Sequence, residues 1–269
     1  MGAIAFAISV SLLFSKEYPV LKPDEPALRA RRVMRYTGLR IIPVVESGIL
    51  KGIVSRLGVL SITSARSNLR VADIAEEPLV VLRQEEELSE AVDKMLSVDE
   101  WYAPVVNEAN RYKGVLGLEH IISYYLRKED KPSSLMKPVE EFMTSNVEAI
   151  YADEHISSLW KKILEYRYAG YPVLDSKGRL VGVVTQYDLI RHGFTRIDFE
   201  SESPPRKGPR IREIMSTPPI TVRPSDPLVK AAEIMLDRGI GRVLVVDIHN
   251  KLLGIVDRED IVKAIMGRS

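Results

Sequence analysis

Two polar side chains, Thr185 and Asp188, stand where an apolar run gives way to a helical pattern. Residues 182–184 before them, Gly-Val-Val, are typical of the end of a buried strand. Thr185 falls at the N-cap of the following helix, where its hydroxyl can accept from a free backbone N–H, and Asp188 falls in the first turn. Nothing in this pattern indicates that either residue is catalytic. Together they are suited to binding ligand hydroxyl groups, because an ionised Asp accepts strong charge-assisted hydrogen bonds.

The same segment occurs four times along the chain. Its leading glycines are Gly52, Gly114, Gly182 and Gly254, so the copies are 62, 68 and 72 residues apart (114−52, 182−114 and 254−182). A unit that recurs in this way indicates a repeat architecture. The two polar positions differ between the copies, which carry Ser55 and Gly58, Gly117 and His120, Thr185 and Asp188, and Asp257 and Asp260.

Each repeat has the same predicted order of elements. A short extended run leads into an amphipathic helix, two strands joined by a tight turn follow, and a second helix ends the unit. In the fourth repeat the strand before the turn is expected at residues 242–246. Apolar residues at helical spacing mark the first helix of each repeat: Leu28, Val33 and Met34; Leu88, Ala91, Val92, Met95 and Leu96; Ile156, Leu159, Trp160 and Ile163; Leu228, Ala231, Ala232, Met235 and Leu236.

Polar, helix-breaking stretches divide the repeats from one another. The clearest is 128–134, and the stretch 198–209 is predicted to be a surface loop because it contains several Pro and Gly residues. We therefore expect repeats at 1–66, 67–131, 132–196 and 197–269. One such unit has too small a core to be stable alone, so the repeats are expected to pair into modules 1–131 and 132–269.

The composition is that of a globular protein, with 45% apolar and 28% charged residues. The 38 Lys and Arg nearly balance the 37 Asp and Glu, which argues against nucleic-acid binding or an acidic membrane surface as a partner. There is no cysteine, which fits a reducing, cytoplasmic location. Many Lys, Arg and Glu beside few Gln are features of thermophilic proteins.

The first 14 residues are almost entirely apolar. They are too few to cross a bilayer, which takes roughly 20 residues. They also lack the basic start and the cleavage site of a signal peptide. We expect an extra strand or helix that packs on the first repeat.

The four copies resemble cystathionine β-synthase (CBS) domains. The resemblance covers residues 16–267 and rests on the strand ending in Pro-Val or Val-Val-Asp and on the Gly-hydrophobic-hydrophobic-Thr/Ser-x-x-Asp close, which Thr185 and Asp188 match fully. Four repeats with nothing else attached also resemble the γ subunit of the AMP-activated kinase and its stand-alone archaeal relatives. The resemblance implies an α/β fold of β-α-β-β-α repeats, paired into two pseudo-twofold modules that can form a disc.

The resemblance also implies clefts that hold adenosine nucleotides, with Asp on the ribose, backbone groups on the adenine and Arg on the phosphates. Repeats one and two have lost the carboxylate, so binding is expected in the second module. Each candidate has a plainer alternative, because Thr185, Asp188 and Asp257 could serve only as helix caps and Arg242 as a surface ion-pair residue. The candidate binding residues are Gly170, Tyr171, Pro172, Val183, Thr185 and Asp188 in repeat three and Arg242, Ile255, Asp257, Arg258 and Asp260 in repeat four.

The expected function is that of a regulatory module rather than an enzyme. It would sense AMP, ADP or ATP and pass its state to a partner protein, with a homodimer as a further possibility. An S-adenosylmethionine-type ligand would use the same Asp, and a scaffold with vestigial clefts is the rival from another class. The four His residues are scattered, so no metal site is expected, no cofactor is required, and nucleotide hydrolysis would need groups that the sequence does not show.

Overall fold

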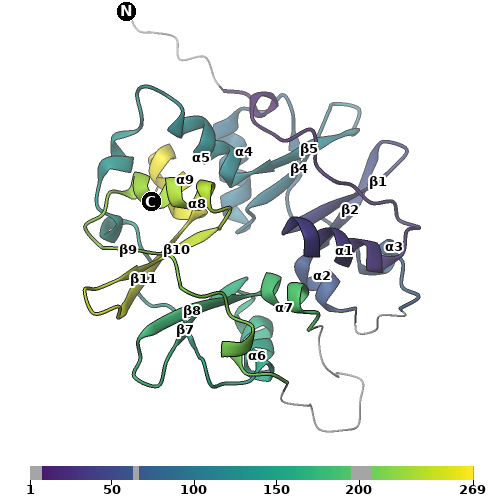
Figure 1. The fold of residues 1–269 in the computed structure, drawn as a ribbon. Helices are drawn as coiled ribbons and strands as arrows, with labels where there is room; N and C mark the ends of the chain where they lie inside the picture. The colour runs from purple at the N-terminus through teal and green to yellow at the C-terminus, as the bar shows by residue number, and fades with distance from the viewer. Residues whose placement is uncertain (1–7, 63–66, 195–207, 269) are drawn as a thin grey trace, which may run out of the picture.

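The computed structural model describes residues 8–62, 67–194 and 208–268. Within them, four small α/β repeats surround a common centre (Figure 1). The helices and strands are, by repeat, α1 (Ala27–Thr37), β1 (Ile41–Glu46), β2 (Ile49–Ser55) and α2 (Arg56–Leu60); α3 (Val71–Ile74), β3 (Leu82–Arg83), α4 (Leu88–Ser97), β4 (Tyr102–Val106), β5 (Tyr112–Gly117) and α5 (Leu118–Leu126); β6 (Ile150–Tyr151), α6 (Ile156–Tyr166), β7 (Gly170–Leu174), β8 (Leu180–Thr185) and α7 (Gln186–His192); β9 (Thr221–Val222), α8 (Leu228–Asp237), β10 (Arg242–Val246), β11 (Leu252–Asp257) and α9 (Arg258–Met266).

Each repeat contributes one small sheet. Its two longer strands form an antiparallel hairpin, as in β7 and β8, and in repeats 2, 3 and 4 a short leading strand adds in parallel. The second helix of each repeat begins at the residue after the last strand of the hairpin. Strand β10 spans Arg242–Val246 and is followed by a turn, which confirms the strand and turn predicted there.

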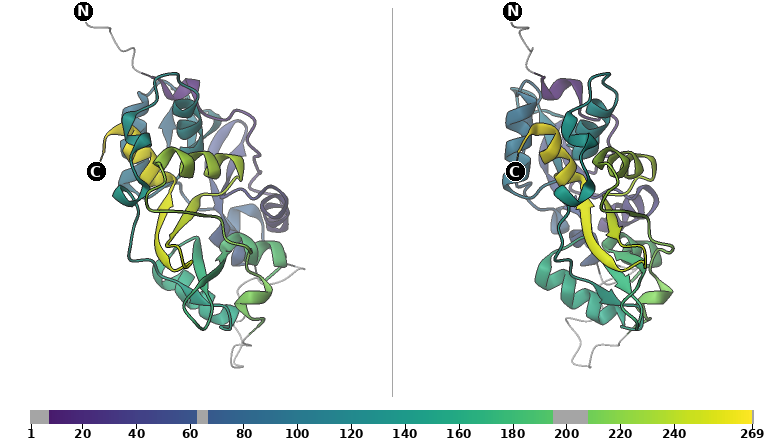
Figure 2. Two further views of the ribbon diagram at one scale, coloured as in Figure 1. Left: turned by 60° about the vertical axis from the view of Figure 1, so that its left-hand side comes forward. Right: turned by 90° about the vertical axis from the view of Figure 1, so that its left-hand side faces the viewer.

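Two different kinds of contact hold the repeats together. Helices pack repeat 2 on repeat 4 and repeat 1 on repeat 3, and each pairing has its own large apolar core. The helices of repeats 2 and 4 gather at the upper end of the molecule, as the turned views show (Figure 2). Sheets join repeat 1 to repeat 2 around Ile41, Ile53 and Val115, and repeat 3 to repeat 4 around Leu180 and Leu244. Every repeat thus contacts one neighbour through its sheet and another through its helices.

The paired repeats also exchange the segments that lead into them. The last strand of each hairpin forms a backbone bridge to the segment that leads into the paired repeat. It does not form this bridge to the segment that leads into its own repeat. The bridges are Ser15 to Val115, Glu76 to Ile53, Ser216 to Val183 and Thr144 to Ile255. The exchange is reciprocal within repeats 1 and 2 and within repeats 3 and 4, which is the symmetry of a pseudo-twofold pair.

This exchange corrects the prediction for the apolar N-terminal segment. Residues 1–7 lie outside the described part of the chain. Val10 begins a short 3-10 helix and packs with Leu13 and Phe14 in the core of repeats 2 and 4, not on repeat 1. The backbone N–H of Val10 donates to Glu86 O at 2.9 Å. The segment crosses to repeat 2 because the repeats exchange the segments that precede their leading strands, a feature that local hydrophobicity does not reveal.

The apolar face of α1 also differs in part from the prediction. Leu28 and Val33 are only half-buried, whereas Ala27, Ala30 and Met34 form the buried face. Helix α1 packs against α2, α3 and α7, and small Ala side chains allow that close approach. Among the described residues, no helix has the length and apolar character needed to span a membrane.

The sheet-to-sheet contact between repeats 3 and 4 should be important for stability. Leu244 is 1% exposed there, whereas Ile248, in the turn after the same strand, is 80% exposed. Leu244→Ala should lower the free energy of unfolding by about 2–5 kcal/mol, since it removes buried methyl groups and leaves a cavity. Ile248→Ala should change it by less than about 0.5 kcal/mol. Urea unfolding of both variants tests this, and equal effects would contradict the packing described.

Candidate functional site

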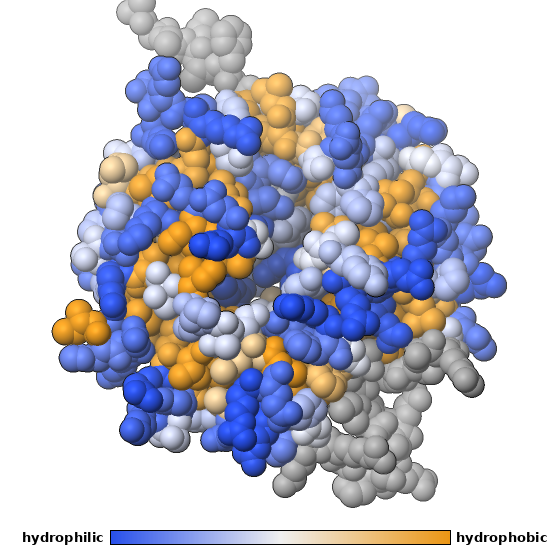
Figure 3. Space-filling view, viewed as in Figure 1, coloured by the Kyte–Doolittle hydropathy of each residue, from blue (hydrophilic) through white to orange (hydrophobic). Residues whose placement is uncertain are grey.

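Two pockets lie between the repeats near the centre of the molecule. The face of the molecule that Figure 3 shows is hollowed near this centre. The first of the two, the Asp188 pocket, has a volume of about 380 Å³. Repeat 3 lines it with Val183, Thr185 and Asp188, and repeat 4 lines it with residues 218–220 and 238–242. Arginines from repeats 1 and 4 complete its wall. The pocket is thus built from segments that are far apart in the sequence.

Asp188 is fixed in the wall of this pocket by hydrogen bonds. Its Oδ2 accepts from Thr185 N at 2.8 Å and from Thr185 Oγ1 at 2.6 Å, and Ser216 Oγ donates to its Oδ1 at 3.1 Å. The N–H of Asp188 in turn donates to Thr185 Oγ1 at 3.2 Å, which completes the cap of α7. Asp188 is only 3% exposed. The helix-capping reading is therefore correct, and the capping carboxylate also faces the pocket.

Four arginines of the Asp188 pocket have no carboxylate partner among the described residues; Arg238 is exposed, and the other three are partly buried. Arg40, Arg56 and Arg242 line the pocket, whereas the arginine ion pairs of the described chain are formed by other residues. Burial together with the neighbouring guanidinium groups lowers the pKa of Arg40 to about 9. Burial likewise lowers the pKa of Arg56 and of Arg242. Concentrated positive charge of this kind is stabilised by an anion.

Two of these guanidinium groups donate to uncharged acceptors. Arg56 donates from Nε to Leu39 O at 3.0 Å and from Nη2 to Gly38 O. Arg242 donates from Nη1 to Gly170 O at 3.3 Å. Carbonyl contacts orient a guanidinium without neutralising it, so the positive charge remains available to a ligand.

Arg258 is a candidate from the sequence that the structure places differently. It lines the pocket and is 6% exposed, but its Nη1 donates to Glu119 Oε2 at 2.9 Å and to Tyr102 OH at 2.7 Å. Its buried Nε has no hydrogen-bond partner in the described chain. Glu119 belongs to repeat 2, where a Cβ at Gly117 would lie 2.5 Å from Glu119 Oε2. The ion pair between Arg258 and Glu119 thus occupies one edge of the repeat 2 motif, in which Gly117 takes the place of a hydroxyl residue.

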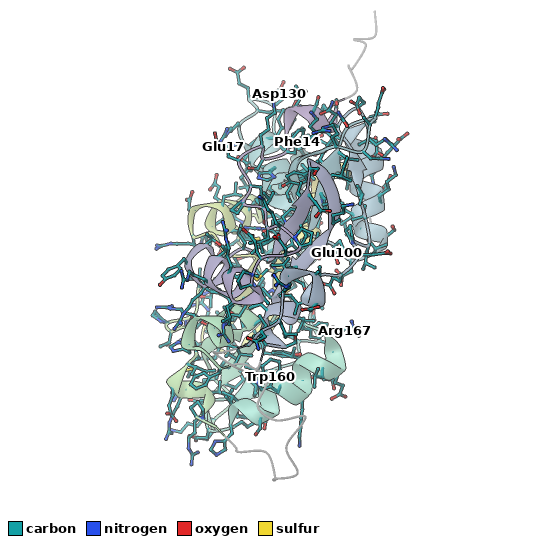
Figure 4. The ribbon with its side chains drawn as sticks, turned by 90° about the vertical axis from the view of Figure 1, so that its right-hand side faces the viewer. Phe14, Glu17, Glu100, Asp130, Trp160 and Arg167 are labelled. Atoms are coloured by element: carbon teal, nitrogen blue, oxygen red, sulfur yellow. The ribbon has the colours of Figure 1, made fainter. Side chains whose placement is uncertain are left out.

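The second pocket, the Asp257 pocket, has a volume of about 440 Å³ and a different charge. Asp257 lines it and caps α9, accepting on Oδ1 from Glu259 N at 2.9 Å and from Asp260 N at 3.3 Å. Glu100 and Arg167 also line it, and both lie toward the right-hand edge of Figure 4, the face turned away from the viewer in Figure 1. The cap at Asp257 is therefore confirmed, and it places a carboxylate where repeat 3 has Thr185.

Carboxyl groups crowd the Asp257 pocket. Burial and the neighbouring Asp257 raise the pKa of Asp260 to about 7. Burial, Asp99 and Glu76 raise the pKa of Glu100 to about 7. Burial and a hydrogen bond with Glu259 raise the pKa of Asp99 to about 6. A phosphate would meet unfavourable charge on this side of the pocket, unlike in the Asp188 pocket.

The structure brings most of the predicted binding residues together, but not all. Val183, Thr185, Asp188 and Arg258 line the Asp188 pocket, Ile255 and Asp257 line the Asp257 pocket, and Gly170 and Arg242 line both. Three predicted residues line neither pocket, namely Tyr171, Pro172 and Asp260.

Tyr171 and Pro172 line neither pocket, whereas Gly170 of the same strand lines both, so the predicted contact of this backbone with an adenine stays a prediction. The side chain of Tyr171 is fully buried, and its hydroxyl donates to Lys162 O at 2.8 Å.

The wall of the Asp188 pocket also contains residues 218–220, which sequence reasoning missed. They arrive through the exchange of leading segments, since Val183 N donates to Ser216 O at 3.0 Å. The repeat pattern would have indicated that residues 218–220 line this pocket only if the exchange of leading segments had been assumed.

Arg40 and Arg56 were also missed by the sequence reasoning. Arg56 stands directly after Ser55 in the altered copy of repeat 1, a position equivalent to Arg258 in repeat 4. Loss of the carboxylate from repeat 1 suggested an inactive cleft there. The structure shows that Arg40 and Arg56 of this repeat line the pocket of repeat 3, and that they line the Asp257 pocket as well.

Comparison with known proteins agrees with this architecture. A sequence profile of the CBS domain matches residues 10–64, 71–127, 139–194 and 211–267. The chain is 25% identical to the uncharacterised protein MJ1225 of Methanocaldococcus jannaschii over 93% of this chain and 95% of that one. It is 28% identical to MJ1404 of the same organism over 95% of this chain, but covers only 61% of that protein.

Two solved structures share the fold along nearly the whole chain. The crystal structure of MJ1225, described as a candidate archaeal homologue of γ-AMPK, gives a TM-score of 0.82 at 24% identity and covers 95% of this chain and 99% of its own. A conserved protein of Pyrococcus horikoshii gives a TM-score of 0.65 at 23% identity, covering 96% and 100%. The predicted four-repeat α/β fold is confirmed by these matches.

The carboxyl group of Asp260 should make stability depend on pH. Its pKa is about 7 in the folded chain against an ordinary 3.8, so the folded state binds the proton more tightly than the unfolded state. Stability should then fall as the pH rises from about 4 to about 7. Asp260→Asn keeps an acceptor for Asp257 N and removes this loss. After allowance for screening, it should raise the free energy of unfolding by about 1–2 kcal/mol at about pH 8 and leave it unchanged near pH 4.

Urea unfolding at several pH values measures this difference. Asp237→Asn, at the exposed end of α8, is the matched control and should show no such dependence. An Asp260→Asn variant that is less stable than the wild type at about pH 8 would contradict the assignment of an unfavourable carboxylate.

Proposed function

We propose that this chain, which belongs to the CBS domain family, is a regulatory module that binds an adenosine nucleotide in the Asp188 pocket. The ligand class is AMP, ADP or ATP. Its ribose hydroxyls would bind Asp188, and its phosphates would bind the guanidinium groups of Arg40, Arg56 and Arg242.

The observation that carries this proposal is a carboxylate and three partly buried arginines in the wall of one cavity, and none of these arginines has a carboxylate partner in the described part of the chain. An ionised carboxylate accepts from vicinal hydroxyls, and guanidinium groups donate to phosphate oxygens in a planar, often bidentate arrangement. A nucleotide has both features at the two ends of its sugar. The volume of about 380 Å³ falls in the range of small-molecule sites.

The rest of the wall suits a flat base. Residues 218–220, Pro-Pro-Ile, offer apolar surface, and residues 239–241, Gly-Ile-Gly, let the backbone approach closely. Backbone N–H and C=O groups along such segments can read the edge of a base, while apolar side chains cover its faces.

Charge favours a phosphate over a sulfonium in this pocket. S-adenosylmethionine would present the same ribose to Asp188, but its positive sulfur would lie near Arg40, Arg56 and Arg242. Like charges in a partly buried site repel strongly. The Asp188 pocket therefore supports an anionic adenosine ligand as the first choice.

Regulation would follow from the way the pocket is assembled. Its wall takes residues from repeat 1, repeat 3 and repeat 4, with Tyr102 from repeat 2 at its edge. A ligand that bridges these repeats stabilises one arrangement of them. A partner protein that prefers this arrangement would then bind more tightly when the ligand is present, by reciprocal linkage.

The first test removes the carboxylate. Asp188→Ala should lower the affinity for AMP about 10- to 100-fold, because two charge-assisted hydrogen bonds to the ribose are lost. Titration calorimetry with AMP measures this, with 2′,3′-dideoxy-AMP as the matched ligand that should bind wild type and variant equally. Asp237→Ala is the control variant, since Asp237 lies exposed on α8 outside the pocket.

Unchanged AMP affinity in Asp188→Ala would overturn the assignment of the pocket. Wild-type protein, freed of carried-over ligand, that binds none of AMP, ADP and ATP would favour the scaffold alternative. Release of phosphate from ATP by the pure protein would instead favour an enzyme.

A further inference from the structure

Trp101 contacts two of the pocket arginines with its ring. It is 6% exposed, and it precedes β4 at the position that Arg40 occupies before β1. The guanidinium carbon of Arg40 is 4.1 Å from the centre of its ring, and that of Arg242 is 5.4 Å away. Both distances are within the range of a cation–π contact.

The position equivalent to Trp101 in repeat 4 is occupied by glycine, and this glycine makes room for the ring. A Cβ at Gly241 would lie 2.6 Å from Trp101 Cζ3 and 3.3 Å from Arg40 Nη2. In repeat 3 the equivalent residue is Ala169. The large side chains of Arg40 and Trp101 thus meet next to Gly241, and any larger residue at Gly241 would displace the Trp101–Arg40 contact.

An aromatic ring holds a guanidinium differently from a carboxylate. A carboxylate accepts the in-plane N–H groups and cancels the charge, whereas a ring contacts the flat face and leaves those donors free. Arg40 has no carboxylate partner in the described chain, and the hydrogen bond found for the Arg242 side chain goes to Gly170 O. Trp101 can therefore keep two like-charged groups near each other with their donors available.

We propose that Trp101 is a positioning residue for phosphate recognition in the Asp188 pocket. It orients Arg40 and Arg242 from behind, because it lines the Asp257 pocket while the two arginines line both. This role rests on the proposed function, in which these arginines bind the phosphate. Trp101 should therefore affect the binding of the phosphate part of the ligand and not the binding of its adenosine part.

The test compares Trp101→Leu with Trp101→Phe. Trp101→Leu should lower the affinity for AMP about tenfold, since the ring face that orients both arginines is lost, and should leave the affinity for adenosine within about twofold. Trp101→Phe keeps a ring and should restore most of the AMP affinity. Titration calorimetry with AMP, adenosine and pyrophosphate provides the three readings, and pyrophosphate should follow AMP.

Trp160→Leu is the matched control, since Trp160 is a buried tryptophan of α6 that lines neither pocket. It should leave all three affinities unchanged. Equal losses for adenosine and AMP in Trp101→Leu would overturn the proposal, because Trp101 would then shape the pocket as a whole. Unchanged AMP and pyrophosphate affinities would overturn it as well.

The pyrophosphate reading separates this proposal from the proposed function. Wild-type protein that binds pyrophosphate but no adenine nucleotide would contradict the function, while the Trp101 variants would still decide the role of the ring. Wild-type protein that binds neither would contradict both.

Discussion

Positive charge concentrated at the centre of the molecule is the constraint on which the site depends. Arg40 and Arg56 come from repeat 1 and Arg242 from repeat 4, and none of them forms an ion pair within the described residues. Burial lowers the pKa of all three, and the neighbouring guanidinium groups lower the pKa of Arg40 further. The apolar cores that pack repeat 1 on repeat 3 and repeat 2 on repeat 4 supply the rigidity that holds them. A protein that keeps cations together at this cost is preorganised for an anion.

The two pockets show how one repeat pattern gives opposite electrostatics. At the N-cap of the second helix, repeat 3 has Thr185 and repeat 4 has Asp257. A hydroxyl caps a helix without adding charge, whereas Asp257 adds a carboxylate beside Asp260, whose pKa rises to about 7. The Asp188 pocket is therefore suited to phosphate, and the Asp257 pocket is not suited to it in the same way. The capping residue contributes to this difference, together with Asp99 and Glu100 in the wall of the Asp257 pocket.

Local patterns in the sequence predicted those features that depend on neighbours along the chain. The recurring glycines, the helical spacing of α4, α6 and α8, and the capping pair Thr185 and Asp188 all have local causes, and all were found. The arginines at 40 and 56 could not be predicted, because their role depends on how repeat 1 packs on repeat 3. Residues 218–220 and the N-terminal segment were misplaced or missed for one shared reason. The repeats exchange their leading segments, and hydrophobicity along the chain does not say which repeat a segment will join.

The central claim is that one pocket holds the ribose with Asp188 and the phosphate with the arginine cluster. A crystal structure with bound AMP tests it most directly. The account predicts the sugar hydroxyls on the carboxylate of Asp188, the base against residues 218–220, and the phosphate among Arg40, Arg56 and Arg242. AMP bound only in the Asp257 pocket, or in the Asp188 pocket with its phosphate turned away from these arginines, would contradict the account.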